Sequence, residues 1–89
     1  MSSAAPRLPE SGWKVLYKDA LTAFLADERN LEHAGAVAEW IERCRAEGPP
    51  AQGIDAGHEI MLSALAGTRI VAEYLVVDFE FLIIVKEFR

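Results

Sequence analysis

The sequence predicts an α+β domain in which two helices pack on one face of a small antiparallel sheet. Residues 59–89 form the most apolar and most β-branched part of the chain, and short turn signals divide them into strands. Upstream lies a segment whose apolar residues follow the three- and four-residue spacing of an amphipathic helix. Helices of this kind bury their apolar stripe by packing on a sheet face, so the two patterns together indicate one layered fold.

The chain length predicts a single domain. The sequence has 89 residues, and we expect the folded part to span residues 13–89. Residues 1–12 are rich in serine, alanine and proline, which is typical of a disordered tail. We find neither a signal-peptide pattern nor an apolar stretch of about 20 residues, so we expect a cytoplasmic protein without membrane association.

Composition limits the classes of partner. The net charge of −5 opposes contact with phosphate backbones, so RNA binding is disfavoured. Hydrophobic residues make up 52% of this short chain, which favours an apolar surface that meets a protein partner or a second copy. The single cysteine excludes an internal disulfide, and the sparse histidines show no ligand spacing, so we expect no metal and no cofactor.

The folded part begins with a short strand. Trp13, Val15 and Tyr17 alternate with Lys14 and Leu16, as in a half-buried strand. The alternative is the first turn of a helix that runs to residue 25. The strand is favoured because the aspartate at position 19 is a good N-cap for a fresh helix over residues 20–26.

A longer helix is expected over residues 31–47. Asp27 or Asn30 would cap it, and Gly48 followed by two prolines would end it. Trp40 borders the apolar stripe. The predicted stripe consists of Leu31, Ala34, Val37, Ala38, Ile41 and Cys44.

The last third is expected to form three consecutive strands after a loop at residues 49–57. The strands are 58–65, 69–77 and 81–88, with tight turns at 66–68 and 78–80. On the second strand, Ile70, Ala72, Tyr74 and Val76 form the core face, and Arg69 shares the other face with Glu73.

The same region carries a family resemblance. Residues 68–74 (TRIVAEY), the acidic turn at Asp78 and Glu80, and the apolar strand at 82–85 resemble the RelE/ParE superfamily of bacterial toxin components. The element order of strand, two helices and closing sheet is similar as well. The resemblance implies a toxin component or toxin-like relative that acts by macromolecular binding, as an mRNA interferase or a gyrase-type inhibitor, with an antitoxin-like protein partner.

The resemblance also implies site residues. Arg69 would be the phosphate-stabilising cation, Lys86 and Arg89 would be supporting cations, and His58 would be an acid or base. An ion pair between Arg69 and Glu73 would occupy the arginine. Whether the chain is an enzyme therefore stays open at this stage.

The alternative function is a non-enzymatic interaction module, which forms a homodimer through an exposed sheet edge. Phe79 and Phe81 flank Glu80 at a hairpin, and they would form an apolar tip that anchors a protein contact. Cys44 lies on the helical stripe and is expected to be a buried, inert thiol.

Overall fold

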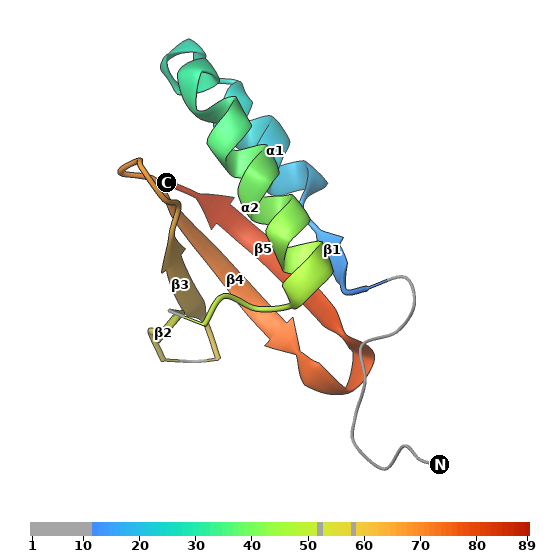
Figure 1. Ribbon diagram of the computed structural model, residues 1–89. Coiled ribbons are helices and arrows are strands. Elements are labelled where there is room, and N and C mark those ends of the chain that lie inside the picture. The colour runs from blue at the N-terminus through green and yellow to red at the C-terminus, as the bar shows by residue number, and fades with distance from the viewer. Residues whose placement is uncertain (1–11, 52, 58) are drawn as a thin grey trace.

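The computed structural model describes residues 12–51, 53–57 and 59–89. The helical elements are α1 (Lys18–Leu25), η1 (Glu28–His33), α2 (Ala34–Glu47) and η2 (Asp78–Glu80), where η denotes a 3-10 helix. The strands are β1 (Lys14–Leu16), β2 (Ile54–Asp55), β3 (Met61–Ala64), β4 (Val71–Val77) and β5 (Leu82–Phe88). The five strands form one sheet, and both α-helices lie on the same face of it, which confirms the predicted α+β class (Figure 1).

The sheet has the order β1-β5-β4-β3-β2 and is antiparallel except at one edge. There β1 runs parallel to β5, so the expectation of a wholly antiparallel sheet is wrong for this pair. The two strands are far apart in sequence, with the helical segment and the strands β2, β3 and β4 between them. At the other edge, β2 forms within the predicted loop at 49–57, where Ile54 pairs with Leu62.

The second predicted strand begins two residues later than expected. Arg69 lies in the turn between β3 and β4 rather than in β4. The Thr68 hydroxyl donates to the Leu65 carbonyl and accepts from the Ile70 N–H, both at 2.9 Å, which holds the turn closed. Gly67 has the positive φ of +77° that this turn requires, as predicted.

A β-bulge at Lys86 sets which side chains of β5 face the helices. Tyr74 pairs with Val85 and Glu73 pairs with Glu87, so Lys86 is the extra residue between them. A regular strand would turn Glu87 toward the helices. With the bulge, Phe88 enters the core instead and is only 4% exposed.

The helical half of the core centres on Trp40. Its ring meets Tyr74 and Phe88 edge-on, with centroids 5.6 Å and 5.9 Å away, and its indole N–H donates to the Ser63 hydroxyl oxygen at 3.3 Å. The buried residues of α2 are Val37, Trp40, Ile41 and Cys44. The predicted stripe is therefore wrong at Ala38, which is exposed. The predicted core face of the second strand is confirmed at Ala72 and Tyr74, which lie in β4, and at Ile70, which directly precedes it.

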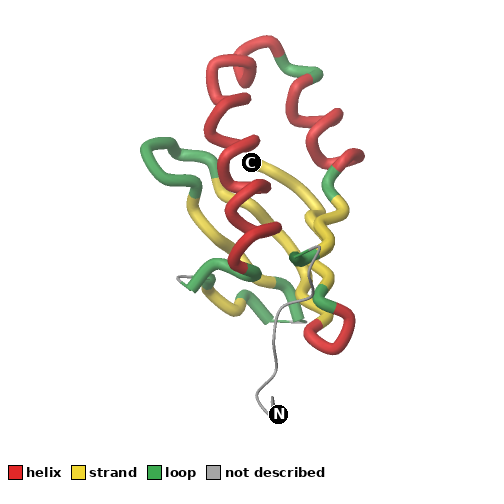
Figure 2. The backbone as a smooth tube through the Cα atoms, turned by 45° about the vertical axis from the view of Figure 1, so that its right-hand side comes forward, coloured by secondary structure: helices red, strands yellow, loops and turns green. Residues whose placement is uncertain are grey.

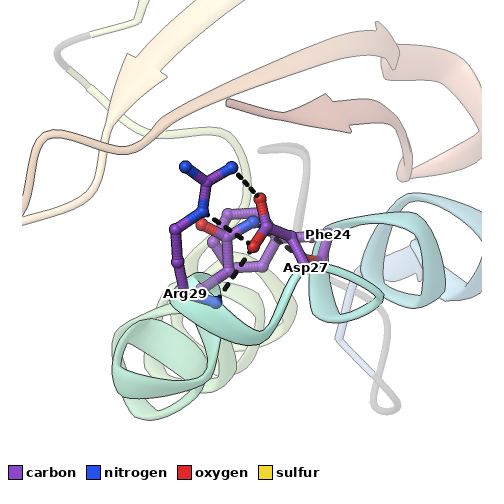
Figure 3. A network of polar contacts seen from close by, with 4 residues as sticks. Phe24, Asp27 and Arg29 are labelled. Carbon is purple, nitrogen blue, oxygen red and sulfur yellow. Dashed lines mark hydrogen bonds and ion pairs between the residues drawn. The ribbon is translucent and has the colours of Figure 1, made fainter.

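The connection between the helices is tighter than the sequence pattern indicates. Asp27 caps η1, not an α-helix, by accepting from the Arg29 N–H at 3.0 Å (Figure 3). The Arg29 guanidinium pairs with the same carboxylate at 2.8 Å and lowers the pKa of Asp27. Asn30 donates to the Phe24 carbonyl at 2.8 Å. Because η1 occupies residues 28–33, Leu31 precedes α2 and stays 54% exposed, outside the stripe predicted for it.

The helix boundaries differ at two further places. Helix α1 begins at Lys18, so Asp19 lies in its first turn instead of capping it. Gly48 ends α2 with φ of +87° and ψ of −162°, an extended conformation with positive φ rather than the expected left-handed helical one. Figure 2 shows that η2, at the tip of the β4–β5 hairpin, lies at the opposite end of the fold from the helix connection. No helix among the described residues is long and apolar enough to cross a membrane.

Candidate functional site

The sheet face that points away from the helices is apolar. Along β5, Ile84 is half-buried on this face while its neighbours Ile83 and Val85 are buried under the helices. The register places Leu16, Ile84 and Leu75 side by side across three strands. We define the open face as Leu16, Ile54, Leu62, Leu75, Val77, Leu82 and Ile84.

No described helix or strand covers the open face. Its residues near the two sheet edges are the most accessible, with Leu16 48% and Ile54 67% exposed. Glu73 lies within the face, between its cross-strand partners Leu62 and Glu87, and Lys14 stands at a border beside Leu82. An apolar surface with a few charged residues is the composition of a protein-binding surface.

The predicted catalytic cations occupy different surroundings. Arg69 is exposed in the β3–β4 turn, where it forms no ion pair with the described residues. Glu73, the predicted partner of Arg69, instead forms an ion pair with Arg89 at 3.2 Å. The reason is the turn position of Arg69, because only strand residues alternate with Glu73 on one face. His58 lies outside the described residues.

Lys86 lines a groove beside β1 that has a volume of about 710 Å³ and shares Leu16 and Ile84 with the open face. The residues lining it are Lys14, Val15, Leu16, Tyr17, Lys18, Asp19, Arg45, Ile84, Val85 and Lys86. This lysine groove contains all three lysines of the chain and neither Arg69 nor Arg89. The predicted grouping of Lys86 with those two arginines is therefore not seen in this groove.

The lysines of the groove and Arg45 differ in whether they form ion pairs. Among the described residues, Lys14, Lys18 and Lys86 form no ion pair, and all three are exposed. Arg45 is held between two partners, since it pairs with the Glu42 carboxylate at 2.7 Å and its guanidinium lies 5.6 Å from the centre of the Tyr17 ring. The groove can therefore bind an anionic group without first breaking an ion pair of its lysines.

Sequence reasoning missed Lys14 and Lys18 as site residues. One sequence feature could have indicated them: the chain has three lysines, of which Lys14 and Lys18 are four residues apart and Lys86 is far away in sequence. Bringing them together needs the parallel pairing of β1 with β5, in which Lys14 is the partner of Leu82. A sequence pattern does not determine which distant strands pair.

The two phenylalanines of the predicted apolar tip have different roles. Phe79 lies in η2 and is 83% exposed, as a contact-forming tip requires. Phe81 follows η2 with φ of +50° and packs edge-on against Trp13, with ring centroids 5.2 Å apart. Phe81 therefore packs against the core, and Phe79 alone protrudes at this end of the sheet.

Two features of the described residues bear on chemistry: the state of the Cys44 thiol and the placement of metal-ligating side chains. Cys44 is 1% exposed, and burial, with a smaller effect from the nearby Glu47 carboxylate, raises the pKa of its thiol to about 12. A thiol in this state is a poor nucleophile. Within the described ranges, no three His, Cys, Asp or Glu side chains gather in a way that would hold a metal ion.

Comparison of this chain with protein-family models, with curated proteins and with solved structures finds no match in any of the three.

Proposed function

We propose that this chain is a non-enzymatic protein-interaction module that self-associates through its open face. The observation that carries the proposal is the row of Leu16, Ile84 and Leu75, which lies across the sheet without cover from any described element. Burying such a row removes apolar surface from water, and a second copy presents the same apolar surface in return.

The size of the face fits a weak interface. Only β4 and β5 are seven residues long, and the other three strands have two to four residues. With strands about 4.8 Å apart and about 3.3 Å per residue, the sheet face covers roughly 360 Å². Two such faces contribute about 700 Å², which is less than the roughly 1,200 Å² at which stable interfaces begin. We therefore propose a transient dimer, with a dissociation constant between about 10 μM and about 1 mM.

Association through the face is favoured over association through a sheet edge. The edge strands are β1, with three residues, and β2, with two residues. Edges this short offer few backbone groups to a second chain, which is a common way to prevent strand addition. The dimer is therefore proposed to form by face-to-face packing of two sheets about 10 Å apart, and not through a sheet edge as the sequence alone suggests.

Sedimentation velocity over a range of concentrations tests the proposal. We expect the mass of the wild-type chain to rise with concentration, and more so at high salt because two copies of charge −5 repel each other. Leu75→Glu, at the centre of the open face, should stay monomeric. Leu31→Glu changes an exposed leucine of η1, away from the face, and should behave as wild type. A wild-type chain that is monomeric throughout, or equal effects of both variants, would reject self-association through this face.

A toxin-like activity is the second candidate. It is supported by the exposure of Arg69 and Lys86, which form no ion pair with any described residue. If the chain is such a toxin, induced expression arrests bacterial growth and Arg69→Ala relieves the arrest. Normal growth at the same expression level excludes this candidate.

A further inference from the structure

Lys14 and Lys18, near the start of the folded part, and Lys86, far from them in sequence, converge on one groove of an acidic protein. Lys14 comes from β1, Lys18 from the start of α1 and Lys86 from the bulge of β5. With Arg45 they place four cations around the groove. Two carboxylates oppose them, that of Asp19 in the lining and that of Glu42, which pairs with Arg45 at 2.7 Å, so the groove is net positive while the whole chain carries −5. The local field therefore has the opposite sign to that of the protein, and it selects an anionic ligand.

The floor of the groove is apolar. Val15, Leu16, Ile84 and Val85 line it between the cations. A small inorganic anion would use the lysines and leave the accessible floor residues, Leu16 and Ile84, in water. A ligand that contacts the whole lining presents carboxylates and aliphatic side chains together. It also needs to be extended, because the groove has a volume of about 710 Å³.

Protein fits this lining better than nucleic acid. Single-stranded nucleic acid is held by aromatic side chains on which bases stack. Among the described residues that line the groove, Tyr17 alone is aromatic, and the Arg45 guanidinium already lies over its ring. The net charge of −5 also opposes a phosphate backbone beyond the groove itself.

We propose that the lysine groove binds an extended acidic segment of a partner protein, with carboxylates on Lys14, Lys18 and Lys86 and aliphatic side chains on the floor. This proposal does not rest on self-association through the open face, although the two surfaces meet at Leu16 and Ile84. The two events have opposite salt dependences. Added salt weakens acidic-segment binding and strengthens association of two copies that both carry −5.

Fluorescence anisotropy of labelled peptides with the full chain tests the groove. The probe is a peptide of alternating glutamate and valine, and the controls are a lysine–valine peptide, a glutamate–glycine peptide and an oligouridylate of equal length. We expect the glutamate–valine peptide to bind most tightly. Lys14→Gln/Lys86→Gln should weaken it about fivefold, because each exposed ion pair contributes a factor of about 1.5 to 5.

A matched variant separates the groove from general electrostatics. Arg43→Gln/Arg69→Gln removes the same charge from exposed positions outside the groove and should leave peptide binding unchanged. Lys14→Arg/Lys86→Arg keeps the charge and should retain binding, and circular dichroism confirms that each variant is folded. Equal weakening by both glutamine pairs, absence of peptide binding, or tighter binding of the oligouridylate with the same lysine dependence would each overturn the proposal.

Discussion

Replacing Phe88 by alanine tests the bulge in β5 and with it the placement of the whole strand. The ring is 4% exposed and meets Phe24 and Trp40 edge-on, each at a centroid distance of 5.9 Å. Truncating a buried phenylalanine costs about 3 to 5 kcal/mol, and the two lost aromatic pairs place this site near the middle of that range, at about 4 kcal/mol. A chain of 89 residues has a total stability of about 4 to 13 kcal/mol.

Urea unfolding, monitored by tryptophan fluorescence, measures the loss in the free energy of unfolding. With a denaturant slope of about 1.3 kcal/mol per molar, the midpoint of Phe88→Ala should fall by about 3 M. Phe79→Ala is the matched control, since the same side chain at 83% exposure should change stability by less than about 0.5 kcal/mol. Equal costs for the two substitutions would refute the reasoning, because β5 would then run without the bulge and Phe88 would face water.

Further predictions concern backbone conformation and titration. Gly35→Ala, in α2 with open space around the added carbon, should stabilise the fold by about 1 kcal/mol. Gly12→Ala should destabilise it by about 1 to 3 kcal/mol, because φ is +76° and the added carbon meets the Arg45 carbonyl oxygen; thermal unfolding compares the two variants. Burial raises the pKa of the Cys44 thiol from 9.0 to about 12, so the unfolded thiol ionises first and stability should fall as pH rises from about 9 to about 12. Between pH 8 and 10.5 this loss should reach about 2 kcal/mol and be absent in Cys44→Ala, as measured by urea unfolding.

The layered architecture was predictable because it depends on local patterns. The β-branched segment ending the chain and the helical spacing before it specify strands and helices over short windows. Gly67 and the core face of β4 follow from the same periodicities, and both predictions are confirmed. The set of helix residues that face the core was less predictable. Leu31 lies in the 3-10 helix η1 and therefore outside the buried stripe of α2.

The candidate sites were less predictable because they depend on long-range pairing. Strict alternation along β5 places Glu87 in the core. The extra residue at Lys86 is seen only in the pairing of β5 with β4. The grouping of Lys14 with Lys86 requires the contact between β1 and β5, which no local pattern encodes. Arg69 was misplaced for a related reason, since Thr68 closes the preceding turn and delays the start of β4.

The parallel contact between β1 and β5 also bears on the order in which the domain assembles during synthesis. The ribosome produces β1 before the helices and the strands β2 to β4, yet its partner, which begins at Leu82, emerges only after all of them. The αα segment and the β3–β4 hairpin can form beforehand from neighbouring residues, whereas closure of the sheet waits for this last strand. A nascent chain that stalls before Leu82 would therefore leave Val15 and Trp40 without the strand that completes their packing.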